Sequence, residues 1–191
     1  MKKSKTRFAV LGILSYGPMS GYDIKKFYEQ NVAGFWSESY GQIYPILKRL
    51  AEEELATKSI HKQAGKPDRH IYALTEKGRE ELQQWLLEST GRHIGRHETL
   101  LKLMFGQQIP IAANILQIEH FRNRQANELK EIESLKERFT QEEVDDPNLP
   151  FWQLAFAYGE HVNRAYINWA EEALATLRKM ESKTSSREKT N

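Results

Sequence analysis

The sequence contains no cysteine, which excludes disulfide frameworks, thiolate metal sites and cysteine nucleophiles. It also lacks a run of about 20 apolar residues, the length that a membrane-spanning helix needs. Its longest charge-free stretches, residues 8–22 and 103–118, are shorter, and a proline interrupts each. Basic residues before Phe8 imitate the start of a signal peptide, but the apolar stretch after them is short and has no suitable cleavage site. These absences favour a cytoplasmic protein.

The sequence motifs of common enzymes are absent as well. There is no Gly-x-Ser-x-Gly, Gly-x-Gly-x-x-Gly or Walker sequence. His93 and His97 stand four residues apart beside Glu98, a spacing that holds a metal on a helix, but Gly91 and Gly95 disfavour a helix there and no third ligand follows. We therefore predict no catalytic residue, no cofactor and no metal site.

The composition is that of a folded chain with one or two domains. Of 191 residues, 39% are hydrophobic and 28% are charged, which is enough apolar surface for a core. The net charge is only +2, but it is unevenly placed. Residues 1–74 carry 12 Lys and Arg against 7 Asp and Glu, whereas the remainder carries 16 against 19. This asymmetry hints at an anionic partner for the N-terminal part.

Residues 1–90 predict the order helix, helix, helix, strand, strand, helix. Capping boxes begin at Ser20 and Ser39, and Thr75 caps the last helix. After the second box, apolar residues recur at the i, i+3, i+4, i+7 positions of a buried helix face, at Ile43, Ile46, Leu47 and Leu50. Residues 55–61 and 70–74 are β-type runs joined by a turn with a basic tip. Pro45, inside the third helix, indicates either a kink or a regular helix that begins near Tyr44.

This order is typical of a winged helix, so we predict a mostly α, α+β fold with a winged helix-turn-helix domain over residues 1–90. In such a domain one helix enters the DNA major groove and the tip of the hairpin, the wing, touches the backbone. Gln42 can pair with adenine, and Lys48 or Arg49 with guanine. An ordinary solvated face is the alternative for these residues.

Residues 91–109 are predicted as a linker with a short helix, 110–180 as a helical dimerisation domain and 181–191 as a disordered tail. Both long helices of the second domain carry narrow apolar seams with 3–4 spacing. Because few other residues are left to cover the seams, we expect them to face a second subunit in a homodimer. The expected interface residues are Ile118, Phe121, Ile132, Leu135, Val162, Tyr166 and Trp169.

Several short motifs occur in a characteristic order: Gly21-Tyr22-Asp23-Ile24, Phe35-Trp36-Ser37, Gln42-Ile43-Tyr44-Pro45 and Tyr72-x-Leu74-Thr75-x-x-Gly78. The ordered set resembles the PadR family of bacterial winged-helix repressors. The resemblance covers nearly the whole chain, because the long C-terminal helices are similar to the family's dimerisation region. It implies a transcriptional repressor that binds a palindromic operator in double-stranded DNA as a homodimer and is released by a small effector.

The resemblance also implies a set of DNA-binding residues. It places Ser39, Gln42, Tyr44, Pro45, Lys48 and Arg49 on the recognition helix, Lys62, Lys66 and Arg69 on the wing, and Tyr22 at the start of the preceding helix. Tyr22 either reaches a phosphate or packs the turn. Glu54 stands where the family commonly has a helix-ending glycine. The left-handed cap costs more with Glu54 than with glycine, so a different end of the recognition helix is one alternative.

The last helix is richer in aromatic residues than packing requires. Aromatic side chains offer a flat apolar wall that suits a planar ligand. If an aromatic or hydrophobic effector binds, we expect it where these residues meet the DNA-binding domain, at Trp152, Tyr158, His161 and Arg164. An aromatic dimer core is the alternative. For the whole chain, the alternative function is a winged-helix protein–protein interaction module that does not bind DNA; salt-dependent retention on duplex DNA separates the two functions.

Overall fold

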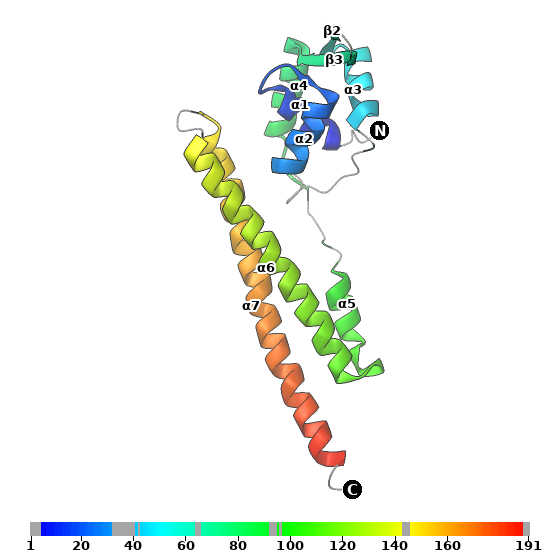
Figure 1. The fold of residues 1–191 in the computed structure, drawn as a ribbon, viewed down its shortest axis with the longest axis vertical. Helices are drawn as coiled ribbons and strands as arrows, with labels where there is room; N and C mark the ends of the chain where they lie inside the picture. Colours follow the sequence, from blue (N-terminus) through cyan, green and yellow to red (C-terminus); the bar gives the residue numbers. More distant parts are fainter. Residues whose placement is uncertain are drawn as a thin grey trace. The chain divides into compact units, whose positions relative to one another are not determined.

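The computed structural model describes residues 5–31, 41, 43–63, 66–91, 95, 97–142 and 146–188 (Figure 1). The chain divides into two compact units, Met1–Arg92 and His93–Asn191.

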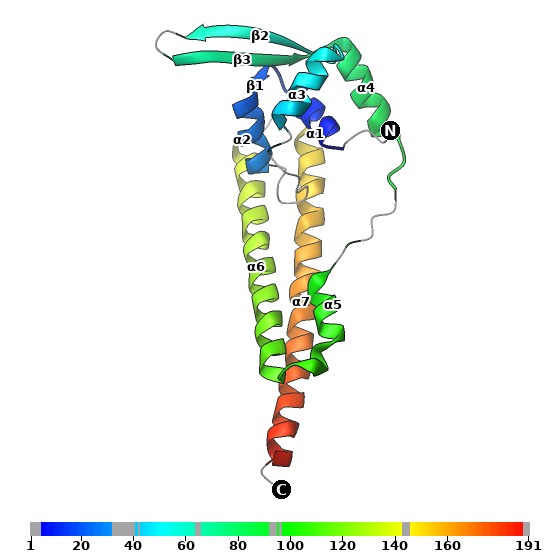
Figure 2. The same ribbon diagram turned by 90° about the vertical axis from the view of Figure 1, so that its right-hand side faces the viewer.

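The first unit is a winged helix with a three-stranded antiparallel sheet. Its elements are α1 (Lys5–Leu14), β1 (Met19–Ser20), α2 (Gly21–Asn31), α3 (Ile43–Glu52), β2 (Ala56–Gln63), β3 (Lys66–Leu74) and α4 (Glu76–Leu87). The strands lie in the order β1-β3-β2, and β2 and β3 form the long hairpin seen in Figure 2. The predicted order of helices and strands is confirmed; β1, a two-residue strand after Pro18, was not predicted.

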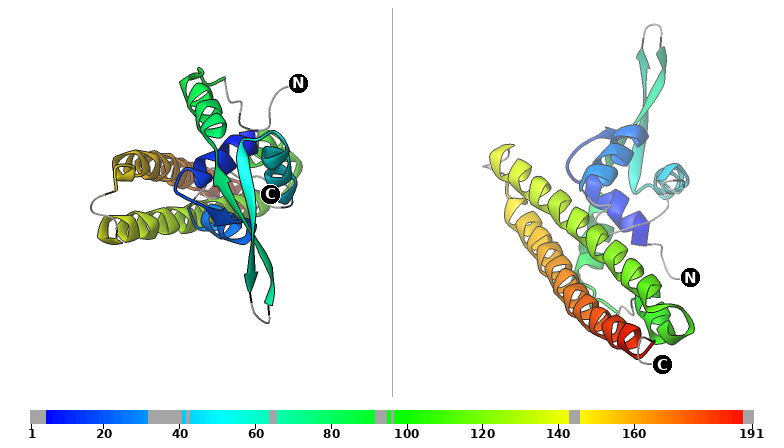
Figure 3. Two further views of the ribbon diagram at one scale, coloured as in Figure 1. Left: turned by 90° about the horizontal axis from the view of Figure 1, so that it is seen from above. Right: turned by 60° about the horizontal axis from the view of Figure 1, so that its bottom comes forward.

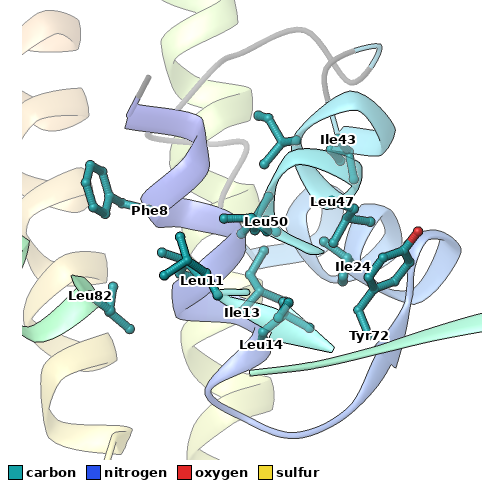
Figure 4. Close-up of a cluster of buried hydrophobic side chains, with 14 of the residues drawn as sticks. Phe8, Leu11, Ile13, Leu14, Ile24, Ile43, Leu47, Leu50, Tyr72 and Leu82 are labelled. Atoms are coloured by element: carbon teal, nitrogen blue, oxygen red, sulfur yellow. The ribbon is translucent and has the colours of Figure 1, made fainter. Parts of the chain in front are cut away.

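One hydrophobic core holds the three N-terminal helices and the sheet together (Figure 4). Leu11, Ile24 and Leu47 are fully buried and come from α1, α2 and α3 in turn. The helix α4 joins this core through Leu82 and through Trp85, whose ring stacks on Phe8 of α1 with centroids 4.6 Å apart. The face of α3 predicted to be buried is buried, at Ile43, Ile46, Leu47 and Leu50.

Pro45 lies in the first turn of α3 and does not interrupt the helix, which begins at Ile43. The first four N–H groups of an α-helix have no partner within the helix, so the missing N–H of a proline costs little there. The alternative in which the regular helix begins near Tyr44 is therefore the one that the structure adopts.

The backbone at the end of α3 has the left-handed conformation that glycine usually adopts at the end of a helix, although the residue there is Glu54. Glu54 has a φ of 61°, and it is the one non-glycine residue with positive φ in the described part of the chain. The Leu55 N–H donates to the Leu50 carbonyl (2.8 Å) and the Glu54 N–H to the Ala51 carbonyl (3.2 Å), which together make a Schellman motif. The departure from glycine therefore leaves the end of α3 unchanged but places a side chain in the left-handed region.

Replacing Glu54 by glycine is expected to raise the free energy of unfolding by about 1 kcal/mol, because glycine reaches positive φ without a Cβ clash. Denaturant unfolding of the full-length protein measures this change. Glu54→Ala is the matched control, because it removes the exposed ion pair with Lys77 but keeps the Cβ. An equal rise in the free energy of unfolding in both variants would show that the charge of Glu54, and not the strain of its backbone conformation, destabilises the protein.

The second unit consists of α5 (Glu98–Met104), the 3-10 turn η2 (Gly106–Gln108), α6 (Ile111–Glu142) and α7 (Leu149–Glu188). Figure 3 shows α6 and α7 side by side as an antiparallel pair. Ion pairs join them along their length, including Arg122 with Glu171 (3.0 Å) and Arg164 with Glu133 (2.7 Å). No helix in the described ranges has the length and apolarity required to cross a bilayer.

The apolar seams of α6 and α7 face each other within one chain. Ile118 is 1% exposed and packs with Ala170, Leu174 and Leu177 of α7, and Phe121 meets Trp169 edge-on at 5.5 Å. The prediction that the seams face a second subunit is therefore wrong for Ile118. The reason is that α7 runs back along α6, so the two stripes cover one another. The other predicted interface residues are half-buried: Phe121, Ile132, Leu135, Val162, Tyr166 and Trp169.

The C-terminal helix is longer than predicted. The sequence predicts a disordered tail from residue 181, whereas α7 continues to Glu188. Residues 181–188 include neither glycine nor proline, the two residues that most strongly disfavour a helix. The Ser182 hydroxyl also donates to the Lys179 carbonyl (3.0 Å) within the last turns.

Candidate nucleic-acid interface

The helix α3 has one buried face and one exposed polar face. Opposite its four buried residues it exposes Tyr44, Pro45, Lys48 and Arg49. Lys48 is 79% exposed and makes only a loose i, i+4 pair with Glu52 (3.7 Å). The structure thus brings together four of the six residues expected on the recognition helix. Ser39 and Gln42 lie outside the described residues.

The start of α2 packs directly against α3. An added Cβ at Gly21 would lie 2.6 Å from Cε1 of Tyr44, so glycine permits this close approach of the two helices. The next residue, Tyr22, is 66% exposed. The hydroxyl of Tyr22 is therefore free of the core, which favours an outward role over packing of the turn.

The capping box at the start of α2 forms as predicted. The Asp23 N–H donates to Ser20 Oγ (3.3 Å) and the Ser20 N–H donates to Asp23 Oδ2 (3.1 Å). Burial opposes ionisation of Asp23, but hydrogen bonds from Ser20 and the charge of Arg69 outweigh it and lower the Asp23 pKa. The cap is thus a charged group, and a cation lies beside it.

That cation is Arg69, which the family resemblance places on the wing as a DNA contact. Its guanidinium forms an ion pair with Asp23 and donates to Ser20 Oγ (3.1 Å). Ser20 is itself paired with Ile71 of β3. Arg69 therefore ties the base of the wing to the start of α2. No pattern in the sequence links Arg69 to Asp23, because the two residues are 46 positions apart.

The wing presents further exposed basic residues. Lys62, expected on the wing, lies in β2 and is exposed; the backbone of Lys66 begins β3, but its side chain is outside the described part of the structure. Lys58, which no sequence motif singles out, is exposed and lies opposite Tyr72 in the β2–β3 ladder. Burial, and then the nearby Tyr44 of α3, raise the pKa of Tyr72, so Tyr72 lies on the side of the sheet near α3. Residues directly opposite each other in an antiparallel ladder point to the same side, so Lys58 lies on that side as well. The alternation of side chains along a strand could have identified Lys58 from the sequence.

If Arg69 positions the wing, Arg69→Gln and Asp23→Asn should weaken operator binding by similar factors, each worth about 0.5–1 kcal/mol for a half-exposed pair. The double variant should then be no weaker than either single variant. Fluorescence anisotropy over a range of salt concentrations measures both affinity and salt slope.

A direct phosphate contact by Arg69 gives a different pattern. Arg69→Gln would then lower the salt slope by about 1, while Asp23→Asn would strengthen binding by removing a negative charge. That pair of results would contradict the positioning role.

The predicted effector residues all lie on α7 but differ in their surroundings. Trp152 packs inward on Phe139, with ring centroids 4.3 Å apart, and Arg164 pairs with Glu133 of α6. Tyr158 and His161 are exposed on α7.

Of the two histidines considered as metal ligands, His93 is outside the described residues, and His97 precedes α5, with its ring edge-on to Tyr166 at 5.9 Å.

Each of the two units matches a model of a known protein family. Residues 10–84 match the model of the transcriptional regulator PadR-like family, and residues 95–178 match the virulence activator alpha C-terminal model. The crystal structure of Bacillus subtilis PadR in complex with operator DNA has a TM-score of 0.79 and 26% identity, covering 91% of this chain and 99% of that one. The chain belongs to the PadR-like transcriptional regulator family.

The sequence relationship is strongest in the winged helix. The negative transcriptional regulator PadR of Bacillus subtilis (strain 168) is 40% identical over 81 residues, which are 42% of this chain and 44% of that protein. The matched span is thus less than half the length of this curated relative. A crystal structure of Bacillus subtilis PadR in complex with p-coumaric acid has a TM-score of 0.72 at 24% identity, covering 90% of this chain and 94% of that one, which bears on the fold alone.

Family membership confirms the resemblance found in the sequence and the predicted fold class. This PadR-like protein is a DNA-binding transcriptional regulator, and its family is one of regulators and not of enzymes. The alternative of a protein–protein module without DNA binding is therefore set aside.

Proposed function

We propose that this PadR-like regulator is a repressor that binds a palindromic operator as a homodimer and is released by a small aromatic or hydrophobic effector. The observation that carries the proposal is the exposed polar face of α3, at Tyr44, Pro45, Lys48 and Arg49, on a helix whose other face is fixed in the core. A rigidly held helix with an exposed polar face is what direct reading of the major groove requires.

In this proposal the residues divide into base readers and phosphate contacts. Gln42 pairs with adenine, and Lys48 or Arg49 with guanine, since these are the pairings that base-edge geometry favours. Ser39, Tyr22, Lys62 and Lys66 contact phosphate oxygens, which position the protein without reading sequence. Lys58 is added to this phosphate set because of its exposed position on the wing.

The homodimer is supported by exposed apolar residues in the helical unit. Leu101, Met104 and Phe105, at and just after α5, are 59%, 80% and 64% exposed, and Leu116 of α6 is 53% exposed. Leu101, Met104 and Phe105 have the i, i+3, i+4 spacing of one helix face, and exposed apolar residues gathered on one face commonly mark an interface. We place the dimer contact here, with the half-buried seam residues at its margin. The name of the Bacillus subtilis relative, a negative regulator, supports repression.

Release by an effector is supported by the aromatic residues on α7, of which Tyr158 is 68% exposed. A ligand at Tyr158, His161, Trp152 and Arg164 would act by changing the separation of the two α3 helices. A coupling of only about 1–3 kcal/mol changes DNA affinity roughly 5- to 150-fold. The p-coumaric acid in the Bacillus subtilis PadR crystal belongs to the same chemical class.

Binding to the promoter upstream of this gene tests the proposal. We expect a preference for an inverted repeat over random duplex, which Gln42→Ala should reduce by about 1–3 kcal/mol through the loss of a paired base contact. Lys62→Ala should weaken specific and random duplexes alike and lower the salt slope by about 1. Equal losses on specific and random DNA in Gln42→Ala would remove Gln42 as a base reader, and no preference for any promoter sequence would contradict the operator itself.

A further inference from the structure

A cavity of about 560 Å³ lies within the helical unit, between α5 and α6. Its volume is in the range that small-molecule sites occupy in proteins. It is lined by His97, Glu98, Thr99, Lys102, Gln117, His120, Phe121 and Arg124. None of these residues belongs to the DNA-binding set or to the effector set on α7.

The lining is rich in hydrogen-bond donors and poor in negative charge. Lys102 of α5 and Arg124 of α6 bring two cations from different helices, and His97 and His120 add two imidazoles. Glu98 is the one carboxylate among the lining residues, and it is already paired with Lys102 at 2.6 Å. The hydrogen bond from Lys102, and then the charges of Lys102 and Arg124, hold the pKa of Glu98 below its ordinary value. Within the described ranges Arg124 forms no ion pair, and its side chain is exposed; its charge acts on the carboxylates of Glu98 and Glu128 nearby.

One wall of the cavity is aromatic. The Phe121 ring lies edge-on to Tyr166 (5.8 Å) and Trp169 (5.5 Å), and these contacts fix its orientation. The Arg124 guanidinium is 5.9 Å from the centroid of Phe121. A cation is thus held beside a rigid ring, an arrangement that suits a ligand with both an anionic head and a flat body.

We propose that this cavity binds a small phosphate monoester with an aromatic body. A phosphate monoester has three acceptor oxygens, which can accept hydrogen bonds from Arg124, Lys102 and the two imidazoles together, whereas a carboxylate has only two. The cavity is larger than inorganic phosphate needs, so the body of the ligand lies on the Phe121 wall. This site goes beyond operator binding, and its occupation is measurable without DNA.

Isothermal titration of the full-length protein with phenyl phosphate tests the proposal, with benzoate and inorganic phosphate as matched probes. Phenyl phosphate should bind about tenfold more tightly than either, since benzoate lacks the third acceptor oxygen and phosphate lacks the ring. Arg124→Gln should weaken phenyl phosphate about tenfold and leave operator affinity unchanged. The control is Lys130→Gln, an exposed cation of α6 outside the cavity lining, which should bind as the parent protein does.

Tryptophan fluorescence gives an independent readout, because Trp169 contacts the Phe121 wall. Phenyl phosphate should change the emission of the parent protein, and Trp169→Phe should remove most of that change. Equal affinity for all three probes, an unchanged affinity in Arg124→Gln, or no binding of phenyl phosphate would overturn the proposal. A loss of operator affinity in Arg124→Gln would instead assign Arg124 to DNA, and would overturn a small-molecule site.

Discussion

A fragment that ends at Gly91 is expected to fold, to sediment as a monomer and to bind operator DNA about 100- to 10,000-fold more weakly than the full-length protein. Among the described residues, the hydrophobic core of the winged helix and the side chains packed against it come from residues 8–85, all of which the fragment retains. The loss arises because two linked winged helices bind two half-sites at a high effective concentration, and a single one does not.

Sedimentation and fluorescence anisotropy measure the two parts of this prediction, and circular dichroism shows whether the fragment is folded. Fusing the fragment to an unrelated dimerising coiled coil should restore much of the affinity. A full-length protein that sediments as a monomer at micromolar concentration would contradict the homodimer. Equal affinities of fragment and full-length protein would show that the second half-site contributes nothing.

Replacing Gly78 by alanine should destabilise the winged helix by about 3 kcal/mol or more, at the upper end of the cost of overpacking. Gly78 is buried in the first turn of α4, where an added Cβ would lie 2.1 Å from the Leu55 carbonyl oxygen and 2.8 Å from Leu74 Cδ1. The Leu55 carbonyl cannot move freely, because it accepts the Thr75 N–H (3.1 Å). The N-cap of α4 depends on the same turn, since the Gly78 N–H donates to Thr75 Oγ1 (3.0 Å).

Gly12→Ala provides the matched control for Gly78→Ala. Gly12 lies inside α1, and an added Cβ there meets nothing within 4 Å. Alanine should therefore be neutral or should stabilise by about 0.5–1 kcal/mol. Denaturant unfolding of both variants measures the difference. Equal effects at the two positions would show that steric contact at Gly78 is relieved by a small shift of α4.

Local features of this fold could be predicted from sequence because neighbouring residues determine them. The Ser20–Asp23 capping box, the buried stripe of α3 and the Thr75 cap each depend on residues at most seven positions apart. The fold class followed from their order. The strand β1 could not be predicted, since two residues carry no periodicity and their partner, β3, is far along the chain.

The parts that sequence did not reveal depend on contacts between distant segments. The pairing of Arg69 with Asp23 requires β3 to lie beside the start of α2. Similarly, a heptad-like stripe does not specify its partner: the sequence alone predicts a second subunit against Ile118, whereas α7 of the same chain covers it. Glu54 shows a third limit: the backbone retains the glycine geometry, because the hydrogen bonds at the end of α3 outweigh the strain of a side chain.

Hydroxyl-radical footprinting of the full-length protein on the promoter upstream of its gene tests the central claim most directly. If two α3 helices read an operator as a homodimer, two protected segments should appear, with their centres about 34–36 Å apart or a multiple of that distance. Their base sequences should form an inverted repeat. The Gln42→Ala variant should give weaker protection of these two segments while its affinity for random duplex stays that of the parent protein. A single protected segment, or protection that does not depend on sequence, would contradict the account.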